Sequence, residues 1–83
     1  MKYDIAVTFT HAVNNTVVAV GYLTEQPIED TLENVEYTRD ALQMRLDKVG
    51  SLTIHDREDN IQLTVMSPVI AQCVMRCLIT EVP

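Results

Sequence analysis

The chain has 83 residues, of which 47% are hydrophobic and 22% charged, and its formal net charge is −6 at pH 7. This composition excludes an intrinsically disordered chain, and the length predicts one small domain, residues 1–83, with a single modest core. The negative charge argues against binding to nucleic acid or to an anionic membrane, because both repel an acidic chain. We therefore expect no direct nucleic-acid partner and no membrane partner.

The cysteine content and the first residues predict a cytoplasmic protein. Two cysteines are too few for a disulfide scaffold. Residues 1–4 place an acid where the apolar region of a signal peptide would begin. The longest apolar run, residues 17–23, is far too short to span a bilayer.

The first part of the chain predicts a β-hairpin. Residues 3–10 alternate between apolar and more polar positions, which is the pattern of a half-buried strand. A valine-rich run, residues 16–23, follows Asn14-Asn15, and asparagine tolerates the positive φ of a tight two-residue turn. Such a turn pairs Val7 with Tyr22 and Phe9 with Val20. The apolar positions of the first strand are Tyr3, Ile5, Val7 and Phe9.

Residues 28–49 show the clearest helical pattern. Apolar residues recur at steps of three and four and form one stripe. Glu29 and Asp30 fall in the first turn and Arg45 and Lys48 in the last, which matches the helix dipole. Gly50 is expected to end the helix. The stripe consists of Ile28, Leu32, Val35, Leu42, Leu46 and Val49.

A second hairpin is predicted around a turn centred on Glu58-Asp59. This turn pairs Ile54 with Leu63 and Leu52 with Val65, which keeps the apolar residues on one face. The opposite face then carries polar residues that suit contact with water.

The segment 69–79 fits two structures. Ser67 as N-cap and Pro68 at the first position favour a helix, whereas its β-branched content and alternation suit a strand. We favour the helix. The predicted fold is then α+β in the order ββαββα, a four-stranded antiparallel sheet with two helices on one face. In the alternative, the last helix is a fifth strand.

Acidic and exposed apolar residues on the predicted helix form the candidate binding surface. Glu29, Glu33, Glu36, Asp40 and Asp47 fall within a narrow arc beside the apolar stripe. Opposite the stripe lies a smaller apolar patch, and tyrosine and methionine are favoured at recognition surfaces. A solvated helix face is the simpler interpretation of the acids. The residues predicted to bind a partner are Glu29, Glu33, Glu36, Tyr37, Asp40 and Met44.

Few residues suit catalysis or metal binding. Cys73 and Cys77 are expected to be buried reduced thiols, because a tetrahedral metal site needs further ligands and only His11 and His55 are available. No glycine-rich phosphate loop or catalytic triad is suggested. We therefore predict no catalytic residues, no metal and no cofactor.

The favoured function is a small acidic regulator or inhibitor, of phage or accessory type, that binds a larger protein and forms a homodimer. One alternative is a structural homo-oligomer with no other partner. A second is a small-molecule-binding or catalytic dimer with an interface pocket, in which His11 or His55 would be the residue to examine.

Overall fold

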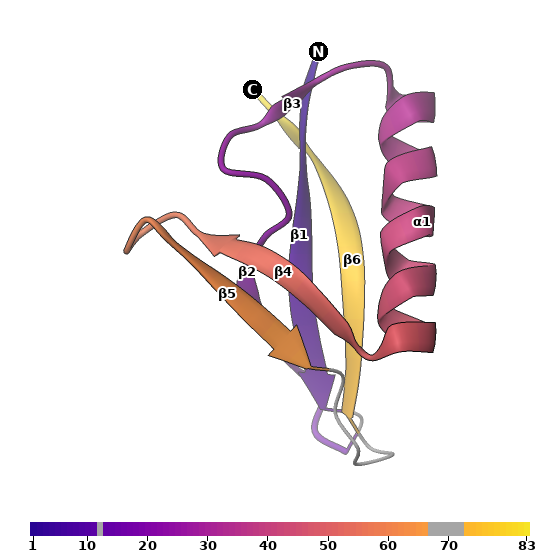
Figure 1. The fold of residues 1–83 in the computed structure, drawn as a ribbon, viewed down its shortest axis with the longest axis vertical. Helices are drawn as coiled ribbons and strands as arrows, with labels where there is room; N and C mark the ends of the chain where they lie inside the picture. The colour runs from indigo at the N-terminus through magenta and orange to yellow at the C-terminus, as the bar shows by residue number, and fades with distance from the viewer. Residues whose placement is uncertain (12, 67–72) are drawn as a thin grey trace.

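The computed structural model describes residues 1–11, 13–66 and 73–83. These residues form six strands and one helix, so the fold class is α+β as predicted (Figure 1). The elements in chain order are β1 (Lys2–His11), β2 (Thr16–Tyr22), β3 (Ile28–Glu29), α1 (Leu32–Val49), β4 (Ser51–Asp56), β5 (Ile61–Met66) and β6 (Cys73–Val82).

β1 is the central strand of an antiparallel sheet. One of its edges pairs with β6 along its whole length, and its other edge pairs with β2 and, at the first residues, with β3. The hairpin of β4 and β5 joins this sheet through one residue pair, Tyr22 with His55. The hairpin therefore projects away from the other strands (Figure 1).

β6 corrects the predicted last helix. The predicted helix over 69–79 is wrong from Cys73 onward, and the alternative of an additional strand is right there; Ser67, Pro68 and residues 69–72 lie outside the described residues. Met75 and Cys77 are buried, while the residues between and beside them are exposed, which is the period of a strand. Residues 73–82 form a strand because they pair with the free edge of β1. A helix-start signal in the local sequence carries no information about this distant pairing.

The first hairpin forms with a different register from the one predicted. Phe9 pairs with Val18 and Val7 with Gly21. The connection is longer than the predicted Asn14-Asn15 turn, because the strands end at His11 and begin again at Thr16. A β-bulge between Val7 and Thr8 then moves the register one residue back toward the predicted pairing, so Val7 is one residue and Phe9 two residues from the predicted partner.

The second hairpin has the predicted register. Ile54 pairs with Leu63 and Leu52 with Val65, and the strands are joined by residues 57–60. The Asp56 carboxylate accepts hydrogen bonds from the backbone N–H groups of Glu58 (3.1 Å) and Asp59 (3.4 Å), which holds the turn together.

α1 begins four residues later than predicted. Residues 28 and 29 form β3 beside β1, and Thr31 is the N-cap, its hydroxyl accepting a hydrogen bond from the N–H of Asn34 (3.3 Å). Glu29 and Asp30 therefore precede the helix. Gly50 ends it as predicted, in the left-handed region with φ 81°, and its N–H donates to the Leu46 carbonyl (3.0 Å).

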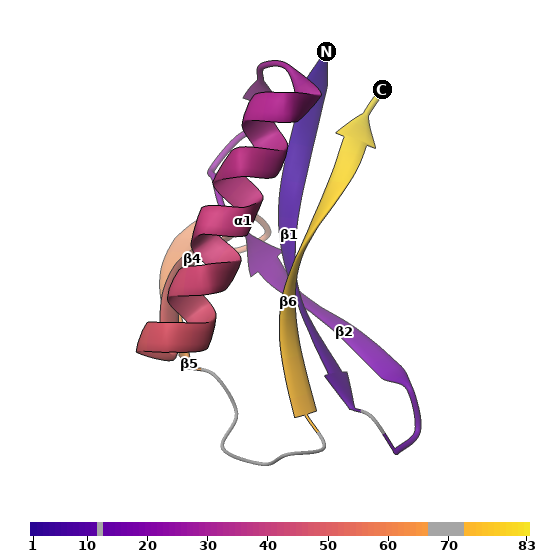
Figure 2. The same cartoon turned by 90° about the vertical axis from the view of Figure 1, so that its right-hand side faces the viewer.

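One face of the sheet packs against α1 to form the core. Val35 and Leu46 are the fully buried residues of the helix, whereas Leu32 and Val49, its first and last residues, are exposed although both belong to the predicted stripe. Only one helix covers this face in the described chain (Figures 1 and 2). The buried apolar residues are Tyr3, Ile5, Val7, Val35, Leu46, Leu52, Ile54, Met75 and Cys77.

Candidate protein-interaction surface

The outward side of α1 carries most of the predicted binding residues, and all of those on the helix are exposed. Tyr37 keeps 78% and Met44 56% of its surface accessible to solvent. Ala41 lies four residues after Tyr37 and three before Met44, so the three side chains are neighbours on the helix. We call Tyr37, Ala41 and Met44 the outer patch.

Four exposed carboxylates lie beside the outer patch. We call Glu33, Glu36, Asp40 and Asp47 the acidic ridge, which extends over about 21 Å at 1.5 Å per residue. Among the described residues, no cation lies within ion-pair distance of Glu33 or Glu36. Asp40 accepts a hydrogen bond from Arg39 at 2.7 Å. The ridge therefore keeps most of its negative charge facing solvent.

The sixth predicted residue, Glu29, is separate from this surface. It lies on β3, where its carboxylate is 3.4 Å from the N-terminal amino group of Met1. Both groups are exposed, so this pair adds little stability.

Gln43 attaches the acidic ridge to the sheet. Its side-chain oxygen accepts a hydrogen bond from the N–H of Cys77 (2.9 Å), and its side-chain nitrogen donates to the carbonyl of Met75 (3.3 Å). The same nitrogen is 3.2 Å from a carboxylate oxygen of Asp47. Gln43 thus lies where the buried side of α1 meets the acidic ridge, directly against β6. Sequence reasoning missed this contact, because nothing near residue 43 indicates which strand the helix adjoins.

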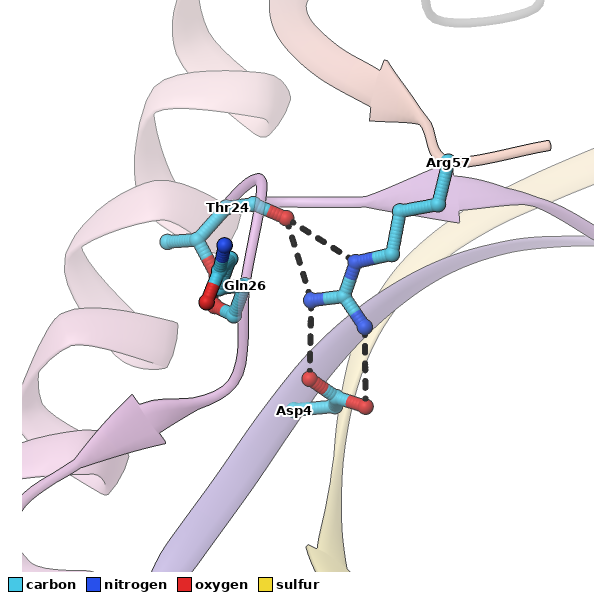
Figure 3. Close-up of polar contacts among 4 residues, drawn as sticks. All are labelled: Asp4, Thr24, Gln26 and Arg57. Atoms are coloured by element: carbon cyan, nitrogen blue, oxygen red, sulfur yellow. Dashed lines mark hydrogen bonds and ion pairs between the residues drawn. The ribbon is translucent and has the colours of Figure 1, made fainter. Parts of the chain in front are cut away.

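A partly buried ion pair holds the β4–β5 turn against the sheet (Figure 3). The Arg57 guanidinium donates to both carboxylate oxygens of Asp4, at 2.9 and 3.2 Å, and to the carbonyl of Thr24, at 3.1 and 3.3 Å. It also lies 3.9 Å above the ring centre of Tyr22. All these contacts are internal, so we assign Arg57 a structural role. The sequence indicated this pair only by Asp4, an acid within the alternating first strand, and it did not indicate that Arg57 is the partner.

The two histidines lie far apart. His11 pairs with Thr16 at one end of β2, and His55 pairs with Tyr22 at its other end. His55 lines a shallow pocket of about 460 Å³ with Glu25, Gln26, Asp56, Arg57, Asn60, Ile61 and Gln62. Because Arg57 is already bound to Asp4, its charge is not free to hold a ligand there.

The described part of the chain contains no group of three or more potential metal ligands among histidine, cysteine, aspartate and glutamate. Cys77 is buried against α1. Burial, and to a smaller extent the charge of Asp47, raises the pKa of its thiol above the ordinary value of 9.0, while Arg39 lowers it slightly. A raised pKa disfavours the thiolate, which is the reactive form.

No family model matches the sequence, and no curated protein or solved structure matches the chain. Within the described ranges, no helix is long and apolar enough to cross a bilayer.

Proposed function

We propose that this chain is a small, non-enzymatic regulator or inhibitor that binds a larger protein through the acidic ridge and the outer patch. The observation that carries the proposal is the exposure of Tyr37 and Met44 beside exposed carboxylates on one helix. Large adaptable side chains supply contact area at interfaces, and neighbouring charges select and orient the partner. A basic surface on the partner complements this arrangement.

Charge reversal on the ridge tests the proposal. Tagged wild-type protein and the double variant Glu36→Lys/Asp40→Lys are used to capture partners from a lysate of the source organism, at low and at high salt. We expect a protein that the wild type captures at low salt to be lost at high salt, because screening weakens exposed charge pairs. The same protein should be lost from the ridge variant.

A matched control makes the same change of charge elsewhere. Glu25 and Glu58 are exposed and lie in loops away from α1, so Glu25→Lys/Glu58→Lys should keep the partner. Retention of the partner by the ridge variant, or its equal loss from both variants, would contradict binding through the ridge. Tyr37→Ala should separately weaken binding by about tenfold or more, as truncation of a central aromatic contact does.

A homo-oligomer is the second candidate, supported by a different surface. On the sheet face opposite α1, Thr10 pairs with Val17 on one side and Val74 on the other, and both valines are exposed. Leu78 is exposed two rows along the same face. Self-association through this face should survive charge reversal of the ridge and be weakened by Val17→Lys, as measured by sedimentation.

A further inference from the structure

β6 has one free edge in the described structure. It pairs with β1 and with no other described strand. Backbone groups of successive residues point to opposite edges of a strand, so those of every second residue share an edge. Because Gln43 bonds the Met75 carbonyl and the Cys77 N–H on the side away from β1, the backbone groups of Ile79 and Glu81 also point to the free edge.

Gln43 already makes the hydrogen bonds of a neighbouring strand. Accepting from one residue and donating to the residue two positions earlier is the pattern that a single residue of a parallel strand makes with its neighbour. The middle of the edge is therefore occupied by a side-chain amide.

The C-terminal half of the same edge is open. None of the described residues makes a hydrogen bond to the outward backbone groups of Ile79 or Glu81. Figure 1 shows the C-terminal half of β6 leaning away from α1 toward the C-terminus. An unpaired strand edge is a template for pairing with another extended chain.

Two acids of the ridge lie level with this open half. Glu36 and Asp40 precede Gln43 by seven and three residues, so they share its side of α1. α1 and β6 run in opposite directions, and the start of α1 and the end of β6 lie at the same end of the molecule (Figure 1). This direction places the two acids toward Ile79 and Glu81 rather than toward Cys73. A chain added at the edge would thus meet negative charge on its helix-facing side and the exposed Leu78 on its other side.

We propose that the partner contributes an extended basic segment, which adds as a strand to the β6 edge along residues 79–81 and directs its basic side chains to Glu36 and Asp40. Strand addition supplies affinity through backbone hydrogen bonds, and alternate side chains supply specificity. The inference rests on the proposed function and names the class of partner segment and its mode of binding.

Two synthetic peptides test it. One alternates lysine and valine over about eight residues, an ordinary strand length, and the other alternates glutamate and valine. In titrations of ¹⁵N-labelled protein, the basic peptide should shift the amide resonances of Ile79 and Glu81. It should also bind about tenfold more tightly than the acidic peptide, since two or three exposed charge pairs account for that difference.

Glu81→Pro removes one outward N–H without touching the bonds to β1, and proline is tolerated at such edge positions. It should weaken the basic peptide about tenfold relative to Glu81→Ala, which loses the same charge and keeps the N–H. Amide hydrogen exchange across β1 checks that both variants remain folded. If the proline variant does not fold, the shift of the Ile79 amide resonance when the basic peptide is added to the wild type still tests binding at this edge.

Three outcomes would overturn the inference. Shifts confined to α1 would refute strand addition while leaving ridge binding, and so the proposed function, intact. Equal binding of the two peptides would refute the basic character of the segment. Concentration-dependent shifts of Ile79 and Glu81 without peptide would assign the edge to a second copy of this chain. Loss of lysate capture from the ridge variant remains the separate test of the proposed function.

Discussion

Asp4 and Arg57 show how one residue pair fixes the position of a whole hairpin. Asp4 is 9% exposed and lies on the central strand, and Arg57 lies in the β4–β5 turn, 53 positions later in sequence. The pair is bidentate, and the guanidinium also donates to the carbonyl of Thr24. Such geometry offsets the loss of hydration that burial imposes on both charges.

Removing either member of this pair alone should destabilise the protein strongly, and removing the second member as well should add little. We expect Asp4→Ala and Arg57→Ala each to lower the free energy of unfolding by about 2–4 kcal/mol, because each leaves the other charge partly buried and unpaired. The double variant should lose less than the sum of the two. Urea unfolding of all four proteins gives the coupling energy.

The exposed pair of Arg39 and Asp40 is the control. Its geometry is short, at 2.7 Å, but the Asp40 side chain is 69% exposed, so Asp40→Ala should change stability by less than about 1 kcal/mol. Strictly additive effects at Asp4 and Arg57 would show that the two residues stabilise the fold independently.

At the scale of elements, the weakest junction of the sheet lies between β2 and β4. One residue pair, Tyr22 with His55, joins them, and Gly21 precedes it at the closest approach of the two strands. A Cβ atom at Gly21 would lie 2.8 Å from the His55 carbonyl oxygen and 2.9 Å from a methyl carbon of Ile54. The carbonyl is backbone and cannot rotate away as a side chain can.

Gly21→Ala should therefore cost about 1–3 kcal/mol of stability, as overpacked core positions do. The amide resonances of Tyr22 and His55 should shift, because the two strands must separate. Gly50→Ala is the comparison: nothing lies within 4 Å of its Cβ, and its positive φ alone should cost about 1 kcal/mol. A Gly21→Ala protein as stable as the wild type would mean that β2 and β4 can move apart here at no cost in stability.

The hairpins explain which parts of the fold the sequence could predict. The β4–β5 register was correct because its four-residue connection is centred where the sequence predicted, at Glu58-Asp59, and the Asp56 carboxylate fixes the turn locally. The β1–β2 register was wrong because its connection, also of four residues, is centred between Val13 and Asn14, one residue earlier than predicted, and because a bulge changes the pairing again. Apolar alternation indicates neither feature.

At the scale of the whole molecule, contacts between distant segments limited the prediction. The helix could be predicted because its apolar period is local, but β6 could not, because its structure depends on a strand at the other end of the chain. Four of the five predicted acids and the outer patch lie on the exposed side of α1, whereas Glu29 lies on β3. Gln43 and the β6 edge were not foreseen, because they exist only once α1 lies against β6.

Cys77 reports on global unfolding, because it is buried between α1 and the sheet. In a Cys73→Ser background, its alkylation under native conditions should be at least about a hundredfold slower than in urea, because only open molecules react. The folded thiol holds its proton more tightly than the unfolded one, since its pKa is raised. The stabilisation that the Cys77 thiol contributes is fully present below pH 9, the ordinary pKa of the unfolded thiol, and it is lost as the pH rises through the pKa of the folded thiol.

Unfolding midpoints measured from pH 7 to pH 10 should therefore fall above about pH 9. They should fall less in a Cys77→Ala variant. Alkylation of native protein as fast as in urea would mean instead that β6 separates from α1 without global unfolding.

The position of β1 has a consequence for how the chain folds. Thr8 bonds to Arg76, 68 positions away, and the pairing of β1 with β6 extends over ten residues of each strand. Such a topology has a high contact order, for which folding in milliseconds to seconds is typical. During synthesis the central strand, β1, emerges long before β6, its longest partner. The nascent chain must therefore hold an apolar, half-paired strand until β6 leaves the ribosome, and in that interval it is most exposed to aggregation.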